Sequence, residues 1–147
     1  MGIVVTVMAA ALFFVVFPVY GSKIASDYPE FSGAYVPVLI YTLVMSLPVW
    51  AAIYEYFRIC REINRDNSFS DQTAKSLEKI SVYAIADTIL LFAGALILLF
   101  VNLMPLALLI SSIVICVLGF GISVISAALS HLVLKAKNIK DENDLTI

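Results

Sequence analysis

Three ionisable side chains lie in or beside otherwise apolar stretches of the sequence: Asp87, Glu55 and His131. A carboxylate inside a membrane costs about 2.5–3.5 kcal/mol unless it is neutralised or partnered. Carboxylate and imidazole groups that meet in such a place can bind a cation or relay a proton. We therefore expect these groups to form a polar cluster for a ligand or a proton. The hydroxyl groups that could bond to them belong to Tyr54, Tyr83 and Ser130.

Each of these groups also has a structural interpretation. Glu55 lies three residues before Arg58 and can pair with it along a helix. His131 is close enough to the end of its apolar stretch to reach interfacial water. Asp87 can be protonated, or bonded to Tyr83 one turn earlier. Both interpretations stay open at this point.

The sequence carries no signature of an enzyme, a cofactor site or a metal site. One histidine and no Cys-x-x-Cys pair leave too few ligands for a metal. Cys60 and Cys116 fall at different depths of the predicted membrane segments, so we expect no disulfide between them. The net charge of −2 offers no general attraction to nucleic acid. We predict a non-enzymatic protein without a cofactor.

Four stretches of the chain are almost free of charged residues. A helix needs about 20 residues to cross a hydrocarbon core about 30 Å thick, and each stretch is close to that length or longer. The chain is 62% hydrophobic, with a mean hydropathy of +1.01. We predict one all-α membrane domain over residues 1–147, with four transmembrane helices in an antiparallel bundle. The predicted spans are residues 3–20, 35–57, 80–101 and 105–134.

The cations lie on one side of this arrangement. Eight of the nine Lys and Arg residues fall in segments 58–79 and 135–147, whereas Lys23 stands alone on the other side. The positive-inside rule then predicts that both segments and both termini are cytoplasmic. We expect residues 1–21 to be retained, because no basic residue precedes the first span; a signal peptide cleaved after this segment is the alternative.

Local signals predict where helices begin and how they pack. Ser70 is a good N-cap, and a helix from there to residue 101 would be about 48 Å long, so it should project into the cytoplasm. The residues between the first two spans, 21–34, have the composition of a loop. Gly119, Ser123 and Ala127 form a ladder of small residues on the fourth span, which favours close packing on the third span, with a homodimer contact as the alternative.

Two segments outside the spans are more specific. One is Asn67-Ser68-Phe69-Ser70, before the third helix, and the other is the terminal sequence that includes Asn143, Leu145, Thr146 and Ile147. Together with four spans in a chain of this size, they resemble the bacterial membrane family catalogued as domain of unknown function 2975. The resemblance implies a multi-pass protein of the bacterial cytoplasmic (inner) membrane with no established activity. It also implies a partner, because such proteins are often encoded beside a small helix-turn-helix regulator.

Two functions follow as hypotheses. In the first, a regulatory or sensory membrane protein binds a cytoplasmic protein partner through the central loop and the carboxyl-terminal tail. That tail could also fold back onto the arginines of the loop. In the second, a small proton-coupled transporter or ligand-binding bundle uses Asp87. Immunity against a membrane-active peptide would leave no recognisable mark in the sequence.

Overall fold

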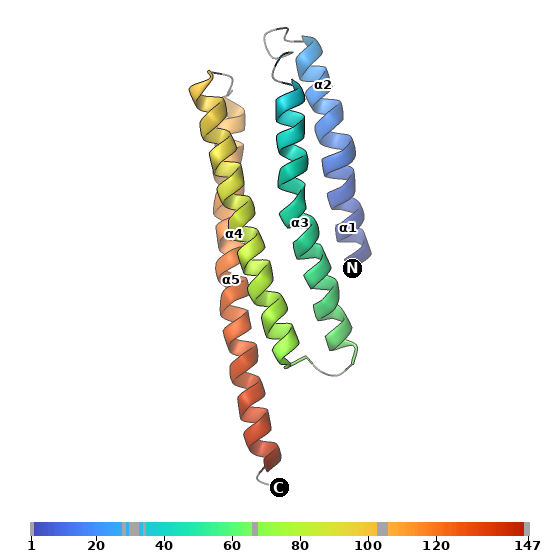
Figure 1. Cartoon of the computed structure of the whole chain (residues 1–147), viewed down its shortest axis with the longest axis vertical. Helices are drawn as coiled ribbons and strands as arrows, with labels where there is room; N and C mark the ends of the chain where they lie inside the picture. Colours follow the sequence, from blue (N-terminus) through green and yellow to red (C-terminus); the bar gives the residue numbers. More distant parts are fainter. Residues whose placement is uncertain are drawn as a thin grey trace.

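The structure is a computed structural model that describes residues 2–27, 29, 33, 35–65, 68–102 and 106–145. The described residues form four long helical rods, which run antiparallel to one another (Figure 1). The described part contains no strand. In chain order the helices are α1 (Gly2–Ala11), the π-helical turn η1 (Leu12–Val16), α2 (Phe17–Asp27), α3 (Tyr35–Ile63), α4 (Asp71–Phe100) and α5 (Leu106–Leu145).

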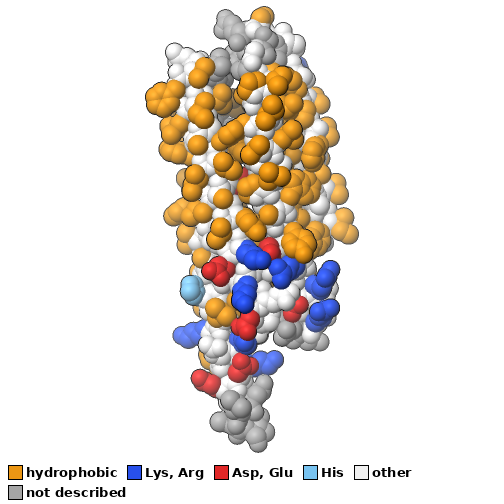
Figure 2. Space-filling view, in the orientation of Figure 1, with side chains coloured by type: hydrophobic (Ala, Val, Ile, Leu, Met, Phe, Trp, Pro, Cys, Tyr) orange, Lys and Arg blue, Asp and Glu red, His pale blue; other side chains and the backbone are white. Residues whose placement is uncertain are grey.

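Within the ranges that the structure describes, four helices are long and apolar enough to cross a membrane, which confirms the predicted all-α, four-span membrane fold. The first of them is the rod formed by α1, η1 and α2 together. Both ends of the chain point toward the end of the bundle that carries the α3–α4 connection (Figure 1). We call this end the charged end, because the charged side chains gather there below a broad apolar surface (Figure 2).

The first rod is longer than the sequence suggests. Residues 21–27 belong to α2, although they were expected to be loop. The Ser22 hydroxyl donates to the Val19 carbonyl at 2.9 Å, and Ser26 does the same to Lys23 at 2.8 Å. These bonds satisfy the serine hydroxyls within the helix, so residues that usually favour turns are accommodated there.

Both ends of α4 have a clear local cause. Ser70 is the N-cap, as predicted: its hydroxyl accepts a hydrogen bond from the Thr73 N–H at 3.1 Å. Asp71 follows in the first turn, where a negative charge is favourable. At the other end Asn102 has a φ of 59°, a left-handed conformation that asparagine tolerates and that ends helices. Its N–H donates to the Leu99 carbonyl at 3.1 Å.

The closest packing lies between α4 and α5, where the small-residue ladder is placed. A side chain added at Gly119 would collide with the Thr88 hydroxyl on α4. One turn along α5, the Ser123 hydroxyl lies 3.0 Å from that of Ser81. Ala127 continues the same stripe at the next turn. The structure thus places the ladder against α4 of the same chain.

The bundle is apolar outside and polar inside. Among the described residues, the buried side chains are mostly serine, threonine and glutamate, and the buried apolar residue is Ala74. Large apolar side chains point outward instead, such as Phe100 at 85% exposed and Leu106 at 72%. In water this surface would drive aggregation. Lipid is therefore the medium that these helices require.

Candidate functional site

The charged end contains a buried carboxylate with a full set of partners. Glu55 on α3 is only 3% exposed. It accepts hydrogen bonds from the Ser76 hydroxyl at 2.8 Å and from the Lys79 ammonium at 3.1 Å, both on α4. Arg58 on α3 adds two contacts, at 3.1 and 3.2 Å. Since both oxygens of the carboxylate are bonded and its charge is matched, Glu55 joins α3 to α4.

The sequence predicted the contact of Glu55 with Arg58 but not its contacts with α4. The Glu55–Arg58 pair is the structural alternative that their three-residue spacing suggested. Ser76 was missed, and Lys79 was counted only as a cation. Their spacing could have indicated a shared role. Ser76 and Lys79 are three residues apart, so they lie on one face of a helix that was expected to continue beyond the membrane.

Asp87 lies in a different environment. By helix rise it is about 16 Å along α4 from Ser76, the residue that contacts Glu55. One of its carboxylate oxygens, Oδ1, is buried and has no hydrogen-bond partner in the part of the chain that the structure describes. Asp87 also falls inside the predicted third span. A charged carboxylate in that position carries an uncompensated cost.

The other members of the predicted polar cluster are scattered. Tyr54 is 65% exposed, His131 is exposed as well, and Tyr83 is half-buried. Ser130 is buried and donates to the Ala74 carbonyl at 2.8 Å. Over the described ranges of the helices, no hydrogen bond or ion pair joins these residues to either carboxylate.

This corrects the single pocket expected from the sequence. The rise of α4 separates Glu55 from Asp87, and the partners of Glu55 are residues outside the predicted set. The two carboxylates that were expected to meet therefore occupy separate sites, Glu55 at the charged end and Asp87 within the span.

An exposed ion pair fastens α5 to the start of α4. The Lys137 ammonium donates to the Asp71 carboxylate. This hydrogen bond, with the charges of Lys137 and Lys75, holds the pKa of Asp71 below its usual value, against the opposing effect of desolvation. The same bond to Asp71 raises the pKa of Lys137. Both residues lie outside the predicted spans, so the pair aligns the parts of α4 and α5 that leave the apolar region.

The residues proposed for partner binding fall into three groups. Phe69 is 54% exposed, whereas Ser70 is buried because it caps α4. Asn143 lies in the last turns of α5, and Leu145 ends that helix. Residues 135–145 continue α5 as a straight helix: Lys137 lies beside the start of α4, and the turns that follow project past the other helices (Figure 1). Asn67, Thr146 and Ile147 lie outside the described residues.

Neither a metal site nor a disulfide is formed by the residues that are described. No group of three or more His, Cys, Asp or Glu side chains in those ranges could hold a metal ion. Cys60 and Cys116 are both free thiols.

Comparison with known proteins settles the family. The model of the family described as "Protein of unknown function (DUF2975)" matches residues 19–147. The chain belongs to this family. A curated relative, "Uncharacterized membrane protein YoaS" of Bacillus subtilis (strain 168), is 27% identical over 145 residues, which cover 97% of this chain and 89% of the relative. No solved structure matches. The match to DUF2975 covers nearly everything from α2 onward and confirms the resemblance seen in the loop and the tail.

Proposed function

We propose that this DUF2975 protein is a non-enzymatic regulatory or sensory protein of the bacterial cytoplasmic membrane. In this proposal it binds a cytoplasmic protein through the α3–α4 connection and the α5 extension, by which we mean residues 135–145. The charged end would face the cytoplasm, because eight of the nine Lys and Arg residues belong to segments at this end.

The observation that carries the proposal is the α5 extension itself. Its last turns, after Lys137, continue as a helix beyond the other rods (Figure 1), and its Ile139 side chain is 51% exposed. Short helices in water gain most of their stability from packing on something else. A partner that covers this helix would supply that packing.

The connection before α4 offers a second apolar contact next to the first. Phe69 is 54% exposed and lies two residues before Asp71. The ion pair between Asp71 and Lys137 brings the start of α4 beside the α5 extension. Phe69 and Ile139 therefore lie on neighbouring elements at the charged end, and one partner could contact both.

The family resemblance suggests the class of partner. A small helix-turn-helix transcription regulator held at this surface would be kept at the membrane, and release would return it to the DNA. The α5 extension carries both signs of charge: Lys135, Lys137 and Lys140 are followed by Asp141 and Glu142. Such a mixed surface suits a protein better than it suits nucleic acid.

Photo-crosslinking in living cells tests the proposal. A photoreactive amino acid at position 69 or 139 should form an adduct with the same protein partner. Phe100 provides a matched control, because it is an exposed phenylalanine at the opposite end of α4. The proposal fails if positions 69 and 139 give no protein adduct, or if position 100 gives the same one.

A second candidate function is supported by a single observation. The buried, unpartnered oxygen of Asp87 is what a proton or cation site within the span would have when empty. A transporter of this kind should show a pH-dependent flux in proteoliposomes that Asp87→Asn abolishes. Asp71→Asn is the control, because that carboxylate is exposed at the charged end. Equal flux in the wild type and Asp87→Asn would exclude the candidate.

A further inference from the structure

A cavity of about 340 Å³ opens at the charged end, between α3 and α4. We propose that it binds the phosphate of an anionic lipid headgroup. Its lining residues are Arg58, Asp71, Gln72, Lys75 and Lys79. All of these residues belong to α3 and α4, although Asp71 is also bonded to Lys137 of the α5 extension. The proposed lipid site does not depend on a protein partner.

The charges around the cavity leave an excess of positive charge. Arg58 and Lys79 share one carboxylate, that of Glu55, so about one positive charge of the two is uncompensated. The carboxylate of Asp71 is already occupied by Lys137, which reduces its repulsion of an anion. Lys75 makes no salt bridge with any residue that the structure describes, and its charge adds to the excess.

The lining residues also retain hydrogen-bond donors. Arg58 contacts Glu55 through Nη1 alone, and a guanidinium has five N–H groups. Lys79 uses one contact on Glu55 and has three ammonium hydrogens. The Lys75 ammonium and the Gln72 amide add further donors. A phosphate with its acceptor oxygens matches this set.

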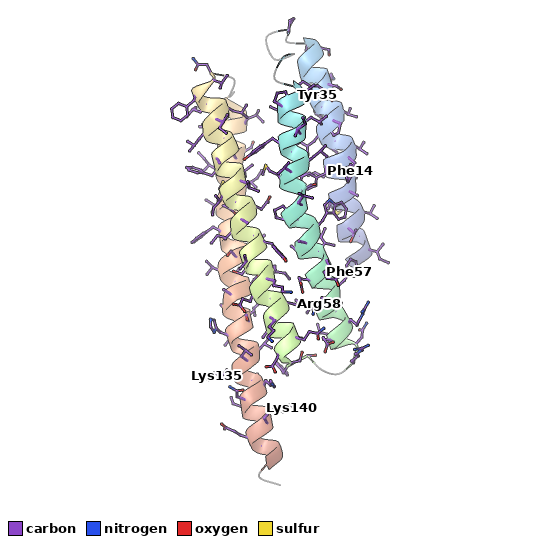
Figure 3. All side chains as sticks on the ribbon, viewed as in Figure 1. Phe14, Tyr35, Phe57, Arg58, Lys135 and Lys140 are labelled. Carbon is purple, nitrogen blue, oxygen red and sulfur yellow. The ribbon has the colours of Figure 1, made fainter. Side chains whose placement is uncertain are left out.

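The position of the cavity favours a lipid as the source of the phosphate. Arg58 follows directly after the predicted second span, and Lys79 directly precedes the third. The charged side chains begin where the apolar surface ends (Figure 2). Phe57, next to Arg58 on α3, is 40% exposed (Figure 3). A headgroup in the cavity would therefore have its acyl chains beside apolar side chains. Basic pockets at this level between membrane helices are suited to anionic headgroups.

Native mass spectrometry of the full-length protein in detergent tests the proposal. The protein is titrated with phosphatidylglycerol, with zwitterionic phosphatidylcholine, and with inorganic phosphate alone. We expect phosphatidylglycerol to bind more tightly than phosphatidylcholine. Lys75→Gln should weaken phosphatidylglycerol binding about fivefold, the effect of one lysine near an anionic membrane surface. Lys75 is chosen because it is not bonded to Glu55, so its removal leaves the α3–α4 link intact.

Lys135→Gln is the matched control, since Lys135 lies on α5 outside the cavity (Figure 3). It should leave phosphatidylglycerol binding unchanged. Equal binding of the two lipids, or equal weakening by the two variants, overturns the proposal. If inorganic phosphate binds in a Lys75-dependent way and the lipids show no preference, the cavity takes free phosphate and the lipid assignment is wrong.

Discussion

Two carboxylates, one at each of two levels of the bundle, have opposite surroundings. Glu55 at the charged end is 3% exposed and bonded to Ser76, Lys79 and Arg58. Asp87 within the span has a buried oxygen without a partner. A buried charge is tolerable when donors surround it and costly when they are missing. The contacts of Glu55 therefore explain its presence as a structural link between helices, whereas no contact among the described residues explains the presence of Asp87.

The two levels are also held together by different forces. At the charged end, hydrogen bonds and ion pairs link α3 to α4 and α4 to α5. Near Asp87, close approach of the helices takes over: Gly119 on α5 lies directly against Thr88, the residue after Asp87. Small residues permit such approach in a membrane, where apolar surface alone gives no preference for helix over lipid.

The largest expected effect is at Glu55. Glu55→Ala leaves Ser76 without its acceptor and Arg58 and Lys79 without their counter-charge. We expect the free energy of unfolding to fall by about 2–3 kcal/mol, and not more, because both cations keep some contact with water. Unfolding in detergent followed by circular dichroism measures this.

Glu78→Ala is the control for this variant, because Glu78 is an exposed carboxylate on the same stretch of α4. Its removal should change stability by less than about 0.5 kcal/mol. Equal losses in the two variants would show that the network around Glu55 contributes nothing specific.

The next effect concerns the packing beside Asp87. Gly119→Ala places a methyl group against the Thr88 hydroxyl, and overpacking of this kind costs about 1–3 kcal/mol. Gly121→Ala has open space around it. Alanine there should leave stability unchanged or raise it by up to about 1 kcal/mol, because alanine is the better helix former. Thermal unfolding of the two variants measures the difference. If Gly119→Ala were as stable as the wild type, α4 and α5 would not be closely packed beside Thr88.

A smaller effect is expected at Asp87 itself. Asp87→Asn removes no bonded partner, so stability should stay within about 1 kcal/mol of the wild type. The same unfolding assay applies. A loss as large as that of Glu55→Ala would remove the contrast between the two carboxylates, because it would reveal a structural partner for Asp87.

The smallest effect is the pH dependence of the Asp71–Lys137 pair. The pKa of Asp71 is lowered, so its contribution is present above its ordinary pKa and is lost as the pH falls through the lowered value. The pKa of Lys137 is raised, so its contribution is lost only as the pH rises through the raised value. Spin labels at Ser68 and Asn138 should therefore report a constant distance near neutral pH and a longer one in acid. A distance independent of pH down to strong acid would show that the pair does not hold α5.

Much of the fold could be predicted because it depends on properties that are read along the sequence, such as hydropathy and helix-capping residues. The four apolar stretches and the Ser70 cap follow from composition and local geometry. The end of the first rod could not be predicted in the same way. Residues 21–27 have turn-like composition, but their serine hydroxyls donate hydrogen bonds to backbone carbonyls of the same helix, so the helix continues through them.

The candidate sites were predictable only in part. That Asp87 would be costly follows from its place in an apolar stretch. The Glu55 network requires Ser76, which is 21 residues away in the sequence, and the cavity requires side chains from both α3 and α4. Spacing along one helix says nothing about which residues of another helix will face it.

The sequence alone determined that this chain is a four-span membrane protein, because length and hydropathy decide whether a helix can reside in lipid. Family membership was likewise carried by short sequence patterns, now confirmed over residues 19–147. Only the tertiary structure decided which carboxylate is satisfied and which is not. The physical reason is that hydrogen bonds act over about 3 Å, so the partner of a buried charge depends on how the helices are placed against one another.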